Sequence, residues 1–230
     1  MNVKLISYTQ PTEEFAQEWK DNPDLLDLVA YCARVSNPSN QMNDQTAEKL
    51  VRFLAKHAHW SPFEMVNAVL EINTTRDIAH QIVRHRSFAF QEFSQRYADP
   101  TQDLSFVFRE ARLQDTKNRQ NSIELEDTPV NRTMEEMWVQ KQNKVKDAAL
   151  GAYKWAIDNG IAKEQARAVL PEGLTESRLY MNGTLRSWIH YIQLRSGNGT
   201  QKEHAVIARD CACVLAAVFP MIDEYITSGG

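Results

Sequence analysis

The stretch from residue 84 to residue 97 reads RHRSFAFQEFSQRY and constrains this chain more than any other part of it. Its arginines and its histidine repel one another, so a fold must either spread these side chains into solvent or gather them around an anion. Arginine binds phosphate and carboxylate groups with paired hydrogen bonds, and the Ser94 hydroxyl can add a donor. The rings that could stack on a flat ligand are Phe88, Phe90, Phe93 and Tyr97. On residue types alone, a solvated basic turn with an inward-facing aromatic stripe explains the stretch equally well.

The composition is that of an ordinary globular protein. Apolar residues make up 43% and charged residues 24% of the 230 residues, which suffices for one domain with a well-buried core. We therefore expect residues 1–230 to form a single domain. The formal net charge of −4 argues against general nucleic-acid binding.

The sequence predicts neither a membrane span nor a secretory segment. No apolar run approaches the roughly 20 residues of a membrane-spanning helix, and the apolar start of the chain is too short for a signal peptide. The cysteines are Cys32, Cys211 and Cys213, an odd number without metal-ligand spacing. We expect them to be reduced core residues of a cytoplasmic protein.

Periodic patterns of apolar residues predict both strands and amphipathic helices. Strands are expected at residues 3–8, 65–73, 104–108 and 174–182. Helices are expected at residues 24–35, 43–58, 74–83, 133–159, 163–169, 184–195 and 200–225. The polar residues 109–132 are expected to form a mobile surface loop.

Local patterns add detail to these helices. Thr74 with Asp77, and Thr200 with Glu203, have the spacing of capping boxes. His204, close to the start of the last helix, is expected to have a structural role. In the 133–159 helix, helical spacing predicts an inward face made of Met134, Met137, Trp138, Val145, Ala148, Ala149, Ala152 and Trp155.

The spacing of the basic stretch is more informative than its composition. Arg-His-Arg at residues 84–86, then seven residues, then Ser94 resembles the signature of the flavin-dependent thymidylate synthases. Three further blocks resemble this family in the same order: His-x-Ser-Pro-x-Glu at 59–64, Ala-Arg-x-Val-Leu-Pro at 166–171, and the helix 184–195. Two positions depart from the family, because many members have His where Met65 stands and Asn where Thr184 stands.

The resemblance implies a fold, a reaction and partners. The fold would be a single α+β domain with an antiparallel sheet and long packed helices. The reaction would be the synthesis of dTMP from dUMP, with methylenetetrahydrofolate as carbon donor and FAD, reduced by NADPH, as hydride source. The family forms homotetramers whose subunits share active sites. Neither a nucleic acid, nor a membrane, nor a metal ion is expected as a partner.

The resemblance also assigns site residues by position. Arg195 is implied as the catalytic residue, in contact with the substrate base. The residues implied to bind dUMP are Gln81, Arg84, Glu92, Phe93, Ser94, Arg96, Arg167 and Arg195. The residues implied to bind FAD are His59, Ser61, Glu64, Arg84, His85, Arg86, Glu92, Thr184, Arg186 and His190. The folate region is implied to include His59, Tyr97 and Arg195.

The residue types are compatible with this chemistry. Arg186 and His190 share a helical face, whereas Arg195, nine residues beyond Arg186, faces the opposite side, as suits a helix between two ligands. A cation beside the uracil oxygens would stabilise the enolate charge that develops when C5 is alkylated, and Arg195 is the candidate. No cysteine lies in the four blocks to attack C6, and no histidine–carboxylate pair is placed to activate Ser94, which we interpret as a binding residue. The sequence has no Gly-x-Gly-x-x-Gly motif, so FAD is not expected in a Rossmann crevice.

Two other classes remain open from the residues. His57, His59, His80 and His85 could hold a metal ion in a hydrolase, although no carboxylate is spaced as in a known site. The Arg-His-Arg turn could belong to an RNA-binding module, although the chain is acidic overall. A further hypothesis is that the loop 109–132 closes over the folate.

Overall fold

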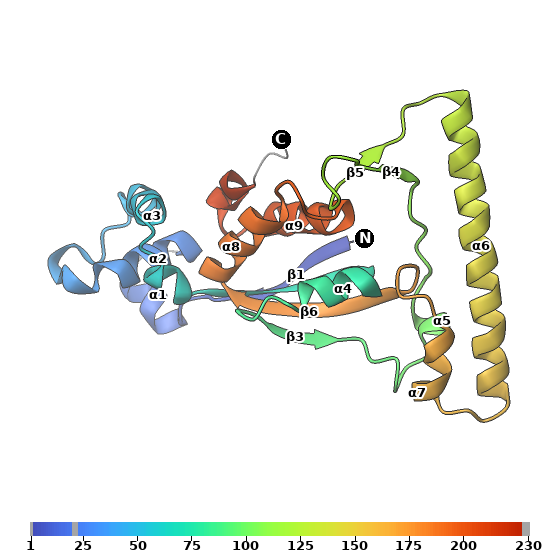
Figure 1. Cartoon of the computed structure of the whole chain (residues 1–230). Helices are drawn as coiled ribbons and strands as arrows, with labels where there is room; N and C mark the ends of the chain where they lie inside the picture. The colour runs from blue at the N-terminus through green and yellow to red at the C-terminus, as the bar shows by residue number, and fades with distance from the viewer. Residues whose placement is uncertain (1, 20–22, 227–230) are drawn as a thin grey trace.

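A four-stranded antiparallel sheet forms the centre of the protein (Figure 1). The computed structural model describes residues 2–19 and 23–226. The strands lie in the order β1 (Asn2–Tyr8), β2 (Asn67–Thr75), β6 (Glu176–Thr184) and β3 (Ala89–Glu92). Strands β2 and β6 pair along nine residues each, from Asn67 opposite Thr184 to Thr75 opposite Glu176. The predicted α+β class with an antiparallel sheet is confirmed.

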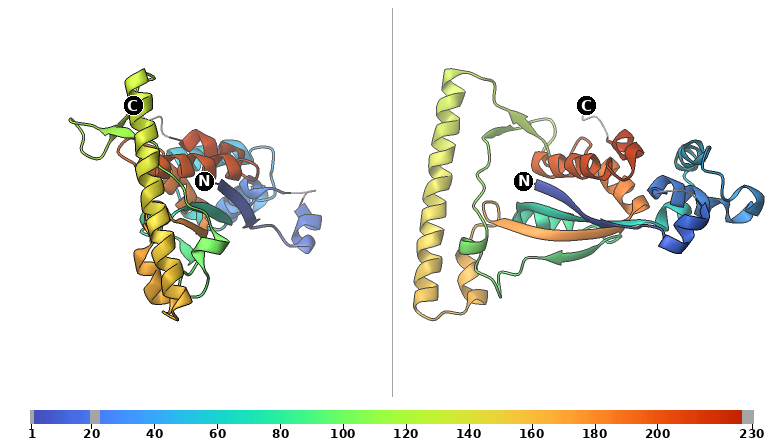
Figure 2. Two further views of the ribbon diagram at one scale, coloured as in Figure 1. Left: turned by 90° about the vertical axis from the view of Figure 1, so that its right-hand side faces the viewer. Right: turned by 180° about the vertical axis from the view of Figure 1, so that it is seen from behind.

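Three helices cover one face of this sheet: α4 (Arg76–Ile82), α8 (Leu185–Arg195) and α9 (Lys202–Leu215) (Figures 1 and 2). Alternate residues of the central strands point into this core, and Leu70, Ile72, Leu179 and Met181 are completely buried. The indole of Trp188 on α8 donates a hydrogen bond to the Ala68 carbonyl at 3.1 Å. This bond and the apolar contacts fix α8, which carries the predicted site residues, against the sheet.

The first part of the chain forms a separate helical layer at one end of the sheet. It contains α1 (Glu13–Trp19), α2 (Leu25–Ala33) and α3 (Ala47–Lys56), followed by a 3-10 turn at Ser61–Glu64. A capping box between Asp24 and Asp27 begins α2. Because α3 spans only Ala47–Lys56, the helix predicted at 43–58 is shorter at both ends than expected.

The long helix α6 (Pro129–Asp158) stands at the opposite end of the molecule (Figure 2). It begins four residues earlier than predicted because Thr128 caps it and Pro129 starts its first turn. Its predicted inward face is wrong. Within one chain only Gln142, Ala149, Tyr153 and Ala156 of the helix are buried. Most of the predicted face is exposed, including Met134, Met137, Trp138, Val145 and Trp155.

The segment between β3 and α6 is more structured than the sequence predicts. It contains a short helix α5 (Pro100–Asp103) and a hairpin of β4 (Arg112–Gln114) and β5 (Ser122–Glu124), so the prediction of a structureless loop is wrong. The predicted strand 104–108 is also wrong, because only Phe106 forms an isolated bridge, with Thr175. The short helix α7 (Lys163–Ala166) follows α6, as predicted.

Two expected capping boxes are absent because their residues bind elsewhere. Thr74 and Thr75 belong to β2, and Asp77 forms an ion pair with Arg109 at 2.8 Å. Glu203 forms ion pairs with Arg109, at 3.1 Å, and with Arg112. Arg109 and Arg112, from the segment predicted to be a loop, thus form ion pairs with the carboxylates that the sequence pattern assigns to helix caps.

The C-terminal helix is shorter than predicted. Helix α9 ends at Leu215, and Pro220–Tyr225 form a separate 3-10 turn. A proline at the start of that turn lacks the N–H needed to continue the α-helix. The expectation that the cysteines are core residues is wrong for Cys213, which is exposed on α9, whereas Cys211 is buried and Cys32 is half-buried. None of the helices in the described part of the chain is long and apolar enough to cross a membrane.

Candidate functional site

The Arg-His-Arg stretch follows α4 and meets the end of α8. The Nε of Arg195 donates a hydrogen bond to Nε2 of His85 at 2.9 Å. Because Nε2 accepts, a neutral His85 carries its proton on Nδ1. Burial and the charge of Arg195 lower the pKa of His85 to about 4, so the ring is neutral at physiological pH. The predicted catalytic arginine therefore lies directly against the motif.

The two arginines that flank His85 face solvent. Arg84 and Arg86 are exposed, and neither guanidinium group forms a hydrogen bond or an ion pair with any residue that the structure describes. Two unpaired cations two positions apart repel one another, and a bound anion would relieve that repulsion. This pair therefore suits a phosphate-containing ligand.

Phe88 anchors the same stretch to the sheet. Its ring packs edge-on against Trp188 of α8, with centroids 4.8 Å apart. It also lies against Gly183 of β6, where an added Cβ would come within 2.3 Å of the ring. Only glycine leaves room for the ring at this point, so Gly183 helps to place the turn that carries Arg84, His85 and Arg86.

A second group joins the 59–64 block to the first half of α8. Arg186 forms an ion pair with Glu64, and the rings of Trp60 and His190 meet edge-on at 4.8 Å. Burial and the charge of Arg186 lower the pKa of His190. Among the residues implied to bind FAD, the structure thus brings Glu64, Arg186 and His190 together.

Three other residues implied to bind FAD are placed differently. Thr184 is the N-cap of α8, where its hydroxyl oxygen accepts from the Ser187 N–H at 3.2 Å and donates to Ser187 Oγ at 3.1 Å. Its hydroxyl proton is therefore already used. Ser61 and His59 are exposed, and the His59 ring lies 6.2 Å from that of His57.

A third group joins the end of the basic stretch to the 166–171 block. Arg96 forms an ion pair with Glu164 at 3.2 Å, and Nε of Arg167 donates to the Glu164 carbonyl at 3.3 Å. The Ser94 hydroxyl accepts from the Arg96 N–H at 3.4 Å. Tyr97, implied for the folate region, is 78% exposed. The residues implied to bind the substrate phosphate are thus neighbours.

Between these groups, the last residue of β3 and the residue after it, Glu92 and Phe93, are two further residues implied for dUMP. Glu92 accepts a hydrogen bond from the Ser177 hydroxyl at 2.8 Å and lies 3.8 Å from Arg76. The Phe93 N–H donates to the Arg178 carbonyl at 2.8 Å. Both residues are therefore fixed to strand β6 through ordinary strand pairing and one polar contact.

Gln81 is held by residues that the sequence reasoning missed. Its Nε2 donates to Oε1 of Gln201 at 2.8 Å, and its Oε1 lies 3.3 Å from Nδ1 of His204. The other nitrogen of His204 lies 3.1 Å from the Tyr191 hydroxyl. The sequence predicts a structural role for His204. It does not predict the contact with Gln81, because the two residues are 123 positions apart.

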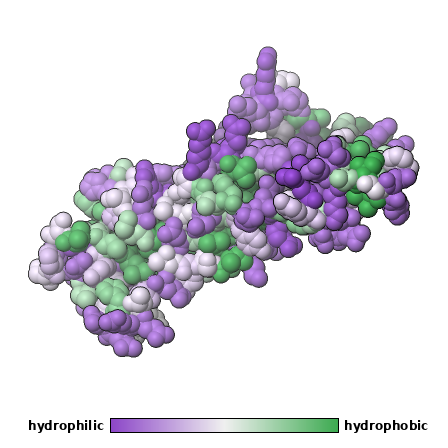
Figure 3. All heavy atoms as spheres, turned by 90° about the horizontal axis from the view of Figure 1, so that it is seen from below, coloured by the Kyte–Doolittle hydropathy of each residue, from purple (hydrophilic) through white to green (hydrophobic). Residues whose placement is uncertain are grey.

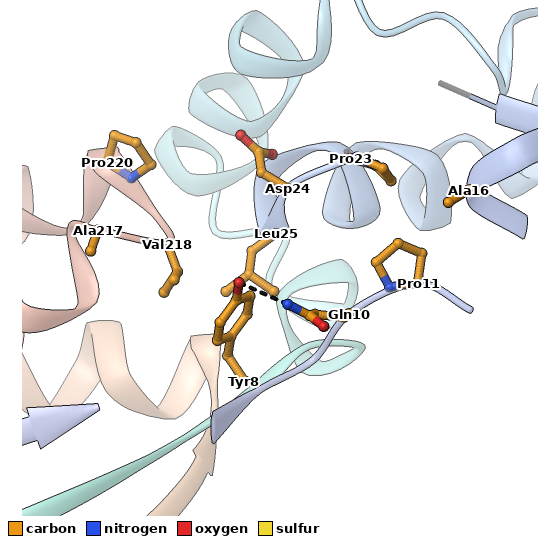
Figure 4. A pocket seen from close by; sticks show the side chains of 10 residues that line it. All are labelled: Tyr8, Gln10, Pro11, Ala16, Pro23, Asp24, Leu25, Ala217, Val218 and Pro220. Atoms are coloured by element: carbon orange, nitrogen blue, oxygen red, sulfur yellow. Dashed lines mark hydrogen bonds between the residues drawn. The ribbon is translucent and has the colours of Figure 1, made fainter. Parts of the chain in front are cut away.

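One chain does not bring all predicted residues into one cleft. The group around Arg96 and Arg167 lies beside α6 and α7, whereas Arg195 and Arg186 lie on α8, towards the other end of the sheet (Figures 1 and 2). A hollow of about 380 Å³ between β1, α2 and the end of α9 is lined by none of the predicted residues (Figure 4). The predicted residues instead form three partly separate groups.

The histidines proposed as an alternative metal site do not gather either. His80 lies 3.5 Å from Glu172, and His85 is bound by Arg195. His57 and His59 lie together beside Phe53 on α3. In the described ranges 2–19 and 23–226, no group of three or more His, Cys, Asp or Glu side chains is arranged to hold a metal ion.

The fold and these groups of arginines define a class, namely an α+β protein whose clustered arginines suit phosphorylated ligands. Comparison with known proteins identifies the family. The family model described as "Thymidylate synthase complementing protein" matches residues 18–221. The "Probable flavin-dependent thymidylate synthase" of Paramecium bursaria Chlorella virus 1 is 45% identical over 96% of this chain and 97% of its own length. The flavin-dependent thymidylate synthase of Synechocystis sp. has the same identity and the same coverage. The chain belongs to the flavin-dependent thymidylate synthase family.

Solved structures share this fold. The structure of the UMP/dUMP methylase PolB from Streptomyces cacaoi, bound with 5-Br dUMP, matches with a TM-score of 0.78. It covers 100% of this chain and 95% of that chain at 24% identity. This likeness confirms the predicted fold class.

Proposed function

We propose that this chain catalyses the reductive methylation of dUMP to dTMP. Methylenetetrahydrofolate would donate the carbon, and FAD would be the bound cofactor. Family membership supports this proposal, and the observation that carries it is the contact between Arg195 and His85. It joins the family's Arg-His-Arg motif to the arginine that the resemblance implies at the substrate base.

The residues of the chain fit an FAD molecule. Arg84 and Arg86 are exposed cations without partners among the described side chains, which suits the two charges of a pyrophosphate. The paired Glu64 and Arg186 offer further polar groups nearby, on the 3-10 turn Ser61–Glu64 and on α8. When bound and reduced by NADPH, FAD would supply the hydride that completes the methyl group. The residues proposed to hold it are His59, Ser61, Glu64, Arg84, His85, Arg86, Glu92, Thr184, Arg186 and His190.

Arg195 is proposed to act on the uracil ring. Its Nε is occupied by His85, and both Nη atoms lack a hydrogen-bond partner among the described residues, so they remain available for ring oxygens. A guanidinium group remains charged throughout and needs no proton transfer to stabilise the enolate that develops at C5. The neutral His85 fixes the orientation of this group without competing for its charge.

The remaining dUMP contacts are proposed from the third group. Arg96 and Arg167, with the Ser94 hydroxyl, would bind the phosphate, since all three lie within one neighbourhood. Gln81, Arg84, Glu92 and Phe93 would contact the rest of the nucleotide. Tyr97 and His59 are proposed for the folate region because their side chains are exposed.

We also propose that the active enzyme is a homotetramer whose subunits share sites. The separation of the three groups in one chain supports this. So does the row of exposed apolar side chains on α6, among which Val130 is 74%, Met137 54% and Trp155 62% exposed. Figure 3 shows hydrophobic surface at the end of the molecule formed by this helix. Burying such side chains against another copy would stabilise the assembly. Use of NADPH and a cytoplasmic location complete the proposal.

Absorption spectroscopy tests the proposed site. The purified chain incubated with FAD should retain flavin bands after gel filtration, and dUMP should accelerate their bleaching by NADPH. Arg84→Ala should reduce FAD retention, whereas Arg132→Ala, which removes an exposed arginine at the start of α6, should not. Retention of no flavin by the wild type would refute the cofactor assignment.

A further inference from the structure

A line of buried and half-buried polar side chains runs through the core beside Gln81. It contains Tyr191 on α8, His204 on α9, Gln81 on α4, and Gln201 and Glu203 at the start of α9. His204 is 0% and Tyr191 1% exposed. The four successive contacts measure 3.1, 3.3, 2.8 and 3.0 Å. None of the five side chains is exposed, so the line belongs to the folded core.

The last residue of the line determines the direction of every hydrogen bond in it. Burial alone would raise the pKa of Glu203, but the hydrogen bond from Arg112 and the charges of Arg109 and Arg112 outweigh it and lower the pKa to about 2. Glu203 is therefore a carboxylate and can only accept. Gln201 must donate to it through Nε2, which leaves Oε1 of Gln201 to accept from Gln81.

The same logic fixes Gln81 and His204. Since Nε2 of Gln81 donates to Gln201, its Oε1 faces His204 and must accept a hydrogen bond from the Nδ1–H. Burial and the charges of Arg195 and His85 lower the pKa of His204 to about 3, so the ring is neutral and carries one proton. That proton lies on Nδ1, and Nε2 accepts from the Tyr191 hydroxyl.

We infer that His204 is a positioning residue for Gln81: as the Nδ1–H tautomer, held by Tyr191, it fixes the amide of Gln81 in one orientation. The inference rests on the proposed function, in which Gln81 contacts dUMP. One N–H of the Gln81 amide is used by Gln201. The second N–H has no partner among the described residues and is the group that the nucleotide can receive. If the amide rotated, a carbonyl oxygen would face the nucleotide at this position.

Two variants with the same branched shape separate this role from packing. His204→Asn and His204→Leu both carry two terminal heavy atoms on Cγ, but only asparagine can place an N–H donor close to the position of Nδ1. The KM for dUMP should be roughly three- to tenfold lower in His204→Asn than in His204→Leu, the worth of one hydrogen bond. The kcat values should agree within about twofold, because the lost interaction is made equally in the ground state and the transition state. Equal KM values in the two variants would overturn the inference.

The wild-type protein gives a test that does not depend on the folding of any variant. Protein labelled with ¹⁵N-histidine should show two rings with a protonated Nδ1 and an unprotonated Nε2, those of His85 and His204, and the signals of the second ring should be lost in His204→Asn. If neither variant folds, His204 is identified in the wild type as the histidine ring whose N–H exchanges most slowly with solvent, because this ring is completely buried. Its tautomer is then measured directly. A proton on Nε2 would contradict the direction derived from Glu203. If the wild type makes no dTMP, the proposed function fails separately, and the tautomer still decides the orientation of Gln81.

Discussion

Lowering the pH from 8 to 5 should destabilise the folded protein through His204. The ring is completely buried, and its pKa falls from an ordinary 6.5 to about 3. Below pH 6.5 the unfolded chain therefore binds a proton that the folded chain does not bind. Because the folded-state pKa is the lower one, the stabilisation is complete above pH 6.5 and is lost as the pH falls towards 3.

The size of the effect follows from this difference. A pH of 5 lies about 1.5 units below the pKa of the histidine in the unfolded chain, and each unit is worth about 1.36 kcal/mol. The free energy of unfolding should therefore fall by about 2 kcal/mol. His85 acts in the same direction, since its pKa is also lowered. Glu203 contributes almost nothing in this range, because its pKa falls from 4.5 to about 2 and its stabilisation is lost between those two pH values.

Urea unfolding at pH 8 and pH 5, at one protein concentration, measures this loss. The comparison is between the wild type and His204→Asn, in which all other titrating groups remain. The free energy of unfolding should fall by about 2 kcal/mol more in the wild type than in the variant. The same pH dependence in both proteins would refute the assignment of His204 as a buried neutral ring.

Three other substitutions test particular contacts. Gly183→Ala would place a Cβ 2.3 Å from the Phe88 ring, so we expect a loss of about 1–3 kcal/mol in thermal unfolding and weaker FAD retention; an unchanged melting temperature would show that the ring moves freely. Ala58 has a left-handed backbone with φ of 56°, and Ala58→Gly should stabilise the protein by about 0.5–1 kcal/mol in urea unfolding, with no gain as the contrary result. Glu203→Gln leaves the Arg109 and Arg112 charges without their shared carboxylate and should cost about 3–5 kcal/mol at pH 8, whereas a loss below about 1 kcal/mol would contradict that role.

The central strands and α8 could be predicted from the sequence because their patterns are local. Alternation in β2 and β6 follows from one buried face, and Leu70 and Leu179 lie where the pattern places them. The helical spacing predicts that Arg186 and His190 share one face of α8 and that Arg195 lies on the opposite face. In the structure Arg186 pairs with Glu64, whereas Arg195 contacts His85. Spacing within one element carries this information.

The misassigned regions depend on partners far away in the sequence. Asp77 and Glu203 resemble helix caps locally, but Arg109 competes for both from a segment that is polar in composition. The apolar spacing of α6 shows which residues share a side of the helix, but it does not show that the rest of the chain covers that side, so the predicted inward face was wrong. Val145 and Trp155 are exposed in one chain for this reason.

The site was predicted mainly through motif resemblance, and its supporting residues were not. Gln81, His85 and Arg195 stand in recognisable blocks, so their positions could be matched one by one. The resemblance assigns no role to Tyr191 or His204. Only their burial and hydrogen bonds show that His204 contacts Gln81 and that Tyr191 contacts His204. Such contacts between α4, α8 and α9 have no signature in a single sequence.

Formation of dTMP is the measurement that tests the central claim most directly. The wild type, supplied with dUMP, methylenetetrahydrofolate, FAD and NADPH, should form dTMP detectable by mass spectrometry. Arg195→Lys, which keeps the charge but loses the Nε contact with His85, should retain FAD and form dTMP at least about tenfold more slowly. If the wild type binds FAD, oxidises NADPH and yet forms no dTMP, the proposed function is contradicted.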